Sequence, residues 1–268
     1  MRVLTLLCFV FWSAMAVASP QPTARDVSYG PDPAHMLDVY LPETLARAAP
    51  VMVMVHGGAW AKGDKANAAV VGNKAEYYLA RGYIFVSVNY RLIPKAYPAD
   101  QARDVAQALR FVQSQLGAWR GREMVVMGHS AGAHLVALVS ADPARYDLAP
   151  WQCTILLDSA ALDVEAQMSN DPERFLIAAF GTDAASWPAV SPQAQVTGTA
   201  APYLIVCSSK RKSPCDQAES FAQAVIVKGG SAQVAPVALR HRAINVSLGL
   251  GHDYTKRVDQ FLQSLGLP

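Results

Sequence analysis

The sequence is poor in charge. Only 16% of its 268 residues are charged, and 23 basic residues nearly balance 21 acidic ones, for a net charge of +2. It holds no run of basic residues, so the attraction that drives nucleic-acid binding is missing and we expect no nucleic-acid partner. A content of 52% hydrophobic residues also excludes a disordered chain, because such chains bury too little apolar surface to fold.

Cysteine is scarce, and the spacings typical of metal sites are absent. The chain has 4 cysteines and 6 histidines but no CxxC or HxxxH pair, so we expect neither a metal nor an organic cofactor. It also lacks repeats and low-complexity linkers, which favours a single domain over residues 19–268. Nothing in the sequence determines the oligomeric state.

The N-terminus has the pattern of an export signal. Arg2 precedes an apolar run at residues 3–12, and the small residues Ala16-Val17-Ala18 follow. This order is typical of a signal peptide over residues 1–18. A membrane anchor is the alternative, but the run is short for a bilayer span and ends at a cleavage-like site. We expect an exported protein, periplasmic or secreted, with no stable membrane anchor and no later transmembrane helix.

Strand-like and helix-like segments alternate along the rest of the chain. Apolar runs without strict polar alternation, separated by helices, predict an α/β fold: a mostly parallel, doubly wound sheet with helices on both faces. Residues 163–200 interrupt this rhythm, so we expect a small insertion there. The expected strands are residues 51–55, 83–88, 124–127, 154–157, 203–206 and 234–239, and the expected helices are residues 73–81, 99–116, 131–140, 215–227 and 255–265.

A GxSxG motif is the strongest chemical signal. Gly128-His129-Ser130-Ala131-Gly132 follows one expected strand and opens an Ala-rich helix. A sharp strand-to-helix turn needs small flanking residues, and it exposes the serine hydroxyl at the edge of the sheet. The Ala131 N–H then lies at a helix N-terminus, where it suits an oxyanion. Ser130 is the candidate nucleophile.

A second motif, His56-Gly57-Gly58-Ala59-Trp60, follows the strand at residues 51–55. Glycines let backbone N–H groups approach a developing oxyanion without obstruction by a Cβ atom. Alone, such a motif indicates an ordinary glycine turn, but its position ahead of GxSxG makes the combination specific. We expect His56 to be structural and not a base.

Four segments of the chain resemble the α/β-hydrolase fold, and most closely its HGGxW esterase branch. They are HGGAWAKGDK (56–65), VNYRL (88–92), YPADQARD (97–104) and GHSAGAHLVAL (128–138). That branch includes carboxylesterases, feruloyl-esterase-like proteins and arylformamidases. The resemblance extends from about residue 26 to the C-terminus. In this fold we expect the small insertion to follow the sixth strand.

By this resemblance, Ser130 is the nucleophile of a hydrolase. The amides of Gly57, Gly58 and Ala131 would form the oxyanion hole, and Trp60 would pack beneath it in the substrate pocket. The remaining positions that match the family, Tyr90, Arg91 and Asp104, would be structural.

Two histidines are candidates for the base. His241 follows the expected strand at residues 234–239, and the base of this fold lies after the last strand. The segment HRAIN (241–245) also resembles the His-x-x-Ile segment of the formamidase-like branch. His252, near the C-terminus, is the alternative, although it reads more plainly as a solvated loop or helix-cap residue. We favour His241.

The acid departs from the family pattern. Aligning Pro214 and Gln217 with the family places Lys210 at the usual acid position, and a lysine cannot stabilise an imidazolium. Asp158 directly ends the strand at residues 154–157, where pancreatic lipases and certain other α/β hydrolases carry their acid. We expect Asp158 to be the acid, with Asp163 second and Asp216 third. The alternatives are that Asp158 caps the insertion and that Asp216 caps a helix.

The leading functional hypothesis is a serine hydrolase that cleaves small-molecule carboxylic esters of small or aryl acyl groups through an acyl-enzyme. Arylformamidase or amidase chemistry would use the same residues. A catalytically silent binding protein on this fold is the rival from another class, and Lys210 motivates it. The presence of both the elbow serine and the oxyanion glycines favours the enzyme.

We predict a disulfide between Cys207 and Cys215, which enclose a short polar loop, and a buried free thiol at Cys153. A closed loop this short contributes about 2 kcal/mol to stability. Mass spectrometry of the non-reduced exported protein should show a chain that begins at Ser19 and contains this cross-link. Two free thiols at these positions would contradict the pairing, and a retained N-terminus would contradict the signal peptide.

Overall fold

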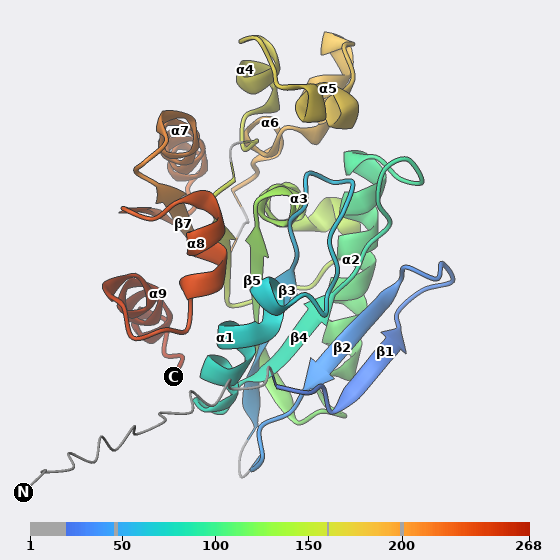
Figure 1. The fold of residues 1–268 in the computed structure, drawn as a ribbon, viewed down its shortest axis with the longest axis vertical. Coiled ribbons are helices and arrows are strands. Elements are labelled where there is room, and N and C mark those ends of the chain that lie inside the picture. Colours follow the sequence, from blue (N-terminus) through green and yellow to red (C-terminus); the bar gives the residue numbers. More distant parts are fainter. Residues whose placement is uncertain (1–19, 46–47, 160, 199–200) are drawn as a thin grey trace, which may run out of the picture.

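The computed structural model describes residues 20–45, 48–159, 161–198 and 201–268, so the predicted signal peptide lies outside the described residues. An eight-stranded sheet with the order β1-β2-β4-β3-β5-β6-β7-β8 forms its centre (Figure 1). The pairs β1–β2 and β2–β4 are antiparallel and all the others are parallel, which confirms the predicted mostly parallel sheet. The strands are β1 (Ala24–Ser28), β2 (Met36–Tyr40), β3 (Ala49–Val55), β4 (Ile84–Val88), β5 (Gly121–His129), β6 (Cys153–Leu157), β7 (Tyr203–Ser208) and β8 (Ala232–Val237).

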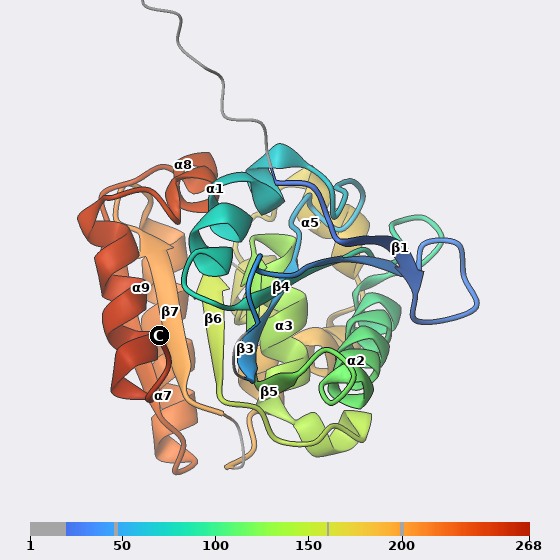
Figure 2. The same ribbon diagram turned by 90° about the horizontal axis from the view of Figure 1, so that it is seen from below.

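Helices cover both faces of the sheet (Figures 1 and 2), because successive residues of a strand point to opposite faces and both faces are apolar. In β3, for example, Val53 packs with α2 and α3 on one face, whereas Met52 and Met54 pack with α1 and α9 on the other. The α-helices are α1 (Ala68–Leu79), α2 (Pro98–Gln115), α3 (Ala131–Ala141), α4 (Val164–Met168), α5 (Arg174–Phe180), α6 (Pro192–Gln195), α7 (Lys212–Val227), α8 (His241–Ser247) and α9 (Asp253–Ser264), and the 3-10 helices are η1 (Pro143–Tyr146) and η2 (Ala184–Val190).

The expected insertion follows β6. It contains α4, α5, η2 and α6 before the chain returns to the sheet as β7. In Figure 1 these short helices lie at the top of the molecule, beyond the carboxyl ends of the parallel strands. The insertion therefore forms a wall above the edge of the sheet at which the motifs converge.

Several predicted boundaries were wrong. Helix α1 begins at Ala68, five residues earlier than predicted, because the Asn67 side chain accepts a hydrogen bond from the N–H of Ala69 and caps it. Helix α7 begins at Lys212 with Arg211 at its N-cap, so Asp216 lies inside the helix and is not its cap. Strands β1 and β2 have no counterpart in the predicted set.

The C-terminal part also differs from the prediction. Strand β8 ends at Val237, two residues earlier than expected, and His241 begins the short helix α8 instead of lying on a loop. Tertiary contacts hold this helix: the side-chain amide of Asn73 on α1 donates to the backbone oxygen of Val246 over 2.6 Å. These contacts link residues far apart in the chain, so a local pattern does not reveal them.

The cysteines are arranged as predicted. The structure joins Cys207 and Cys215 in a disulfide, and Cys153 is a buried free thiol. The disulfide closes the loop between β7 and α7, which carries Lys210 with its side chain exposed to solvent.

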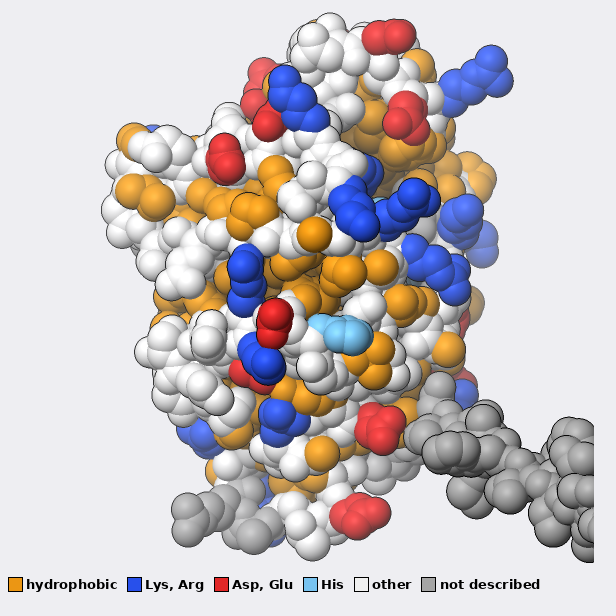
Figure 3. Space-filling view, turned by 60° about the vertical axis from the view of Figure 1, so that its left-hand side comes forward, with side chains coloured by type: hydrophobic (Ala, Val, Ile, Leu, Met, Phe, Trp, Pro, Cys, Tyr) orange, Lys and Arg blue, Asp and Glu red, His pale blue; other side chains and the backbone are white. Residues whose placement is uncertain are grey.

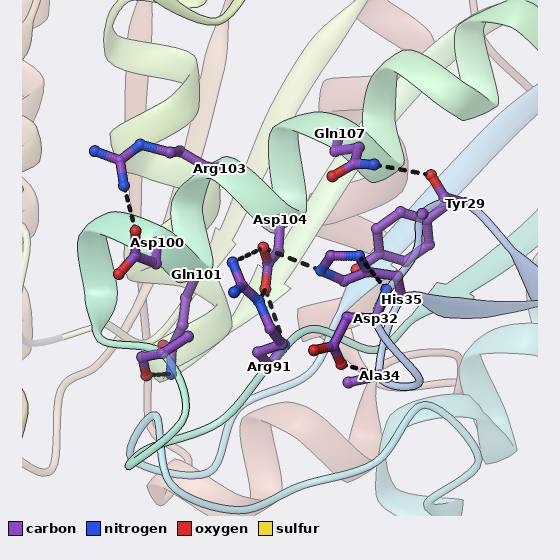
Figure 4. Close-up of polar contacts among 12 residues, drawn as sticks. Tyr29, Asp32, Ala34, His35, Arg91, Asp100, Gln101, Arg103, Asp104 and Gln107 are labelled. Atoms are coloured by element: carbon purple, nitrogen blue, oxygen red, sulfur yellow. Dashed lines mark hydrogen bonds and ion pairs between the residues drawn. The ribbon is translucent and has the colours of Figure 1, made fainter.

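The matched positions Arg91 and Asp104 are part of a network that holds the fold together (Figure 4). Arg91 binds Asp104 through two side-chain hydrogen bonds of 2.8 and 2.6 Å. His35 Nε2 lies 3.1 Å from Asp104 Oδ1, and its ring stacks on Tyr29. The network ties helix α2 to the β1–β2 hairpin and to the segment after β4.

Within the described residues, no helix is both long and apolar enough to cross a bilayer.

Candidate active site

Ser130 lies on a tight turn between β5 and α3. Its φ of 56° is in the left-handed region, and its N–H donates to the backbone oxygen of Leu157 over 3.0 Å. A Cβ atom on Gly132 would come within 2.3 Å of the backbone oxygen of Val55, so only glycine lets the turn pack against the end of β3. The half-buried serine hydroxyl thus lies at the carboxyl edge of the sheet, as the motif predicts.

The glycine loop after β3 packs directly on this turn. A Cβ atom on Gly57 would come within 2.7 Å of the backbone oxygen of His129 and 2.9 Å of the Cβ of Ser130. Among the described residues, no acceptor binds the N–H groups of Gly57, Gly58 or Ala131. Three backbone donors beside Ser130 are therefore available to a ligand.

His56 is structural, as expected. Its Nδ1 donates to the backbone oxygen of Gly57 over 2.8 Å, and its ring stacks on Tyr90 at a centroid distance of 4.5 Å. Burial lowers the pKa of His56, which therefore stays neutral. The hydroxyl of Tyr90 donates to the backbone oxygen of His56 over 3.0 Å and so fixes the start of the glycine loop.

Asp158 and His241 are in contact. His241 Nδ1 lies 2.7 Å from Asp158 Oδ2, although the two residues are 83 positions apart in the chain. Asp158 directly follows β6 with a φ of 57°, and its N–H donates to the backbone oxygen of Val206 over 2.7 Å. Parallel pairing of β6 with β7 therefore places the carboxylate at the edge of the sheet, beside the start of α8 where His241 lies.

The carboxylate of Asp158 is inaccessible to solvent, with 0% of its side chain exposed. Burial acts to raise its pKa, but the hydrogen bonds from His241 and the Ser208 amide, together with the charge of Arg211, lower it below the ordinary value. Asp158 therefore stays ionised at neutral pH, which suits a group that orients an imidazole.

Arg211 is a third member of this cluster that the sequence analysis missed. Its Nη2 lies 2.5 Å from Asp158 Oδ2 and 3.1 Å from His241 Nδ1. No sequence motif indicates this position of Arg211, because it depends on the path of the disulfide loop.

Two further side chains, which the motifs did not single out, hold the candidate base His241 in place. His129 Nε2 donates to the backbone oxygen of His241 over 3.1 Å, and the two rings pack at a centroid distance of 4.5 Å. Burial is the main reason that the pKa of His129 falls to about 3, so this ring stays neutral. The buried Lys74 on α1 donates to the side-chain and backbone oxygens of Asn245 on α8. Burial lowers the pKa of Lys74 to about 7.

The predicted residues meet in one cavity of about 810 Å³. Trp60, Phe175 and Leu176 supply an apolar wall, and the Trp60 and Phe175 rings stack at a centroid distance of 6.4 Å. Phe175 comes from the insertion and was not predicted. The face that carries α7, α8 and α9 exposes apolar side chains in its middle with Lys and Arg side chains around them (Figure 3). The cavity is lined by Ser130, His241, Asp158, Gly57, Gly58, Ala131 and Trp60, which are all of the predicted site residues.

The side chain of Trp60 is hydrogen-bonded to His134 on α3. Its Nε1 donates to His134 Nδ1 over 3.1 Å, and His134 Nε2 donates to the backbone oxygen of Val190 in η2 over 2.8 Å. Burial lowers the pKa of His134 to about 4, so the ring stays neutral and keeps this tautomer. His134 thus connects Trp60, which lines the cavity, to the insertion.

The alternative candidates lie elsewhere. Asp163 caps α4 by accepting from the N–H of Ala166, Asp216 lies on α7, and His252 is at the N-cap of α9. None of the three lines the cavity. Among the described residues, Ser130 Oγ and His241 share no hydrogen bond, and no group of three or more His, Cys, Asp and Glu side chains is placed to hold a metal ion.

Comparison with known proteins gives consistent relatives. The family model described as BD-FAE matches residues 37–150, which include Gly57, Gly58 and Ser130 but neither Asp158 nor His241. A probable isoprenylcysteine alpha-carbonyl methylesterase of Oryza sativa subsp. japonica is 34% identical over 136 residues, which are 48% of this chain and 32% of that protein. The kynurenine formamidase of Danio rerio is 32% identical over 172 residues, 58% of this chain and 57% of that protein.

The chain therefore spans about a third of the first of these relatives and little more than half of the second. Among solved structures, a truncated form of a carbohydrate esterase from gut microbiota superposes with a TM-score of 0.77 at 19% identity, covering 92% of this chain and 96% of that one. This likeness concerns the fold. Together these matches show that the chain has the α/β-hydrolase fold and is similar to esterase-like proteins of that fold.

Proposed function

We propose that this protein is a serine hydrolase that cleaves carboxylic esters through an acyl-enzyme. The observation that carries the proposal is the 2.7 Å contact between Asp158 and His241, in the same cavity as Ser130 and the glycine loop. A carboxylate, an imidazole and a serine that converge from three strand ends have the composition of a catalytic triad. The Oryza sativa relative is named as a methylesterase, which agrees with ester hydrolysis.

In the proposed reaction, Ser130 Oγ attacks the ester carbonyl carbon while His241 Nε2 takes the hydroxyl proton. Asp158 accepts the hydrogen bond from His241 Nδ1 and so selects the tautomer with a free lone pair at Nε2. Collapse of the tetrahedral intermediate breaks the bond to the alcohol oxygen, and His241 returns the proton to that oxygen. Water then attacks the acyl-enzyme by the same proton route and releases the acid.

The resting structure leaves Ser130 and His241 without a mutual hydrogen bond, as is common before substrate binds. The free N–H groups of Gly57, Gly58 and Ala131 are the proposed donors to the oxyanion. Loss of one such donor commonly costs a factor of 10²–10³ in turnover, so these backbone groups carry a large share of the rate.

The proposed substrates carry small or aryl acyl groups. Trp60, Phe175 and Leu176 line the same cavity as Ser130 with apolar side chains, which suit such groups. An arylformamidase or amidase would use the same residues, and the Danio rerio relative is named as a formamidase. A panel of p-nitrophenyl esters and N-formyl aryl amides, compared by kcat/KM, distinguishes the two reactions.

We further propose that the protein acts outside the cytoplasm. The disulfide between Cys207 and Cys215 supports this location, since disulfides persist in oxidising compartments. A reducing cytosol would leave the loop beside the active site open.

The first test is removal of the nucleophile. Ser130→Ala should lower ester hydrolysis by a factor of about 10⁴ or more and abolish labelling by a fluorophosphonate probe, because no other group forms the acyl bond. Its thermal unfolding should match that of the wild type, since no described residue forms a hydrogen bond with the hydroxyl. Near-normal turnover by the purified variant would disprove the assignment, and a wild-type protein that neither reacts with the probe nor turns over esters would be a silent binding protein.

The second test concerns the acid and the base. Asp158→Asn should keep the fold but lower kcat by about 10³–10⁴, because the amide favours the wrong imidazole tautomer. His241→Ala should be as damaging as loss of Ser130, since members of one catalytic unit are not additive. His252→Ala, the matched control at an exposed helix cap, should stay within about twofold of the wild type. A large loss in the His252 variant would move the base to that residue.

A further inference from the structure

The disulfide loop between β7 and α7 supplies both remaining partners of Asp158. The backbone N–H of Ser208 donates to Oδ1 over 2.8 Å, and Arg211 donates to Oδ2. Both residues lie between Cys207 and Cys215, which the disulfide joins. Because the carboxylate is fully buried, it needs such donors to offset its desolvation. The resemblance would place the acid on this loop, at the position of Lys210. The loop instead carries two groups that bind Asp158.

Arg211 also reaches the base. Its Nη2, His241 Nδ1 and Asp158 Oδ2 form a triangle with sides of 2.5, 2.7 and 3.1 Å. A guanidinium only donates and keeps its charge, whereas a ring nitrogen carries either a proton or a lone pair. The 2.7 Å side joins Nδ1 to the carboxylate, so Nδ1 bears the proton and Arg211 donates to Oδ2. A lone pair on Nδ1 facing Arg211 would instead place the proton on Nε2, where it blocks the base.

The charges around His241 act in opposite directions. Asp158, at the end of β6, stabilises a protonated His241, whereas Arg211, just before α7, disfavours it. His129 on β5 packs on the ring and is neutral, Arg240 and Arg242 flank His241 in the chain, and Lys74 on α1 contacts the same helix through Asn245. Arg211 is the cation in direct contact with both the acid and the base.

We propose that Arg211 is a positioning residue that fixes the Asp158 carboxylate and, through its charge, extends hydrolysis to lower pH. With two cations sharing one carboxylate oxygen, His241 gains less from protonation than it would beside Asp158 alone. It therefore remains able to accept the serine proton in more acidic solution. This inference rests on the serine-hydrolase mechanism proposed above.

The test is the pH dependence of kcat/KM in Arg211→Met, which removes the charge and keeps the length of the side chain. Its acid limb should move to higher pH by about one unit, a modest value for a neighbouring charge because 42% of the arginine side chain is exposed. Arg211→Lys retains the charge and should move the limb by about 0.3 units at most. Lys210→Met is the matched control, since it removes a cation from the same loop outside the cavity, and its limb should not move.

A purely structural role gives a different result. It would lower kcat/KM equally at all pH values, and an unmoved or lowered acid limb in Arg211→Met would overturn the proposal. If this variant does not fold, Arg211→Gln keeps hydrogen-bond donors without the charge and serves the same comparison.

A second readout separates this inference from the proposed function. Nitrogen-15 NMR of labelled histidine follows protonation of His241 in the Ser130→Ala background, where no turnover is needed. Replacing Arg211 by Met there should shift the protonation of His241 to higher pH. Unchanged protonation overturns the role of Arg211 even in an active hydrolase. If the protonation of His241 shifts as expected but the wild-type protein has no esterase activity, the role of Arg211 is supported and the hydrolase is refuted.

Discussion

Two backbone hydrogen bonds beyond the ends of the parallel strands set the geometry of the site. The N–H of Ser130 donates to the backbone oxygen of Leu157, and the N–H of Asp158 donates to that of Val206. Each bond continues the ladder for one residue after its strand, so β5 and β6 end in step, whereas β7 continues to Ser208. Both residues then turn sharply, with φ values of 56° and 57°. The two turns aim the hydroxyl and the carboxylate at the same cavity.

The buried charge of Asp158 imposes the next requirement. An isolated carboxylate in this position would be strongly destabilising, so its two oxygens must find donors. The structure meets this need with His241 on one side and with the disulfide loop on the other. The proposed acid thus depends on a segment about 50 residues further along the chain, and the disulfide limits how far that segment can move.

The proposed base, His241, depends on contacts of another kind. His241 begins a seven-residue helix, α8, which is too short to be stable alone. Asn73 and Lys74 on α1 bind its backbone from one side, and His129 holds its first carbonyl from the other. His129, the variable position of the GxSxG motif, therefore has a structural role: its imidazole holds the proposed base, while the next residue is the proposed nucleophile.

The sequence by itself determined the α/β class, the serine on its strand-to-helix turn and the glycine loop. These features depend on the local pattern of apolar residues and on glycines at tight turns, and both can be read directly from neighbouring residues. It also pointed to Asp158, because Lys210 cannot serve as the acid and Asp158 directly follows a strand. It did not reveal α8, Arg211 or the pocket residue Phe175, and it placed the start of α7 incorrectly. These features arise where segments distant in sequence meet. Only the tertiary structure brings the loop after β7 against the end of β6, and the buried carboxylate of Asp158 is stable there because that loop supplies hydrogen-bond donors to it.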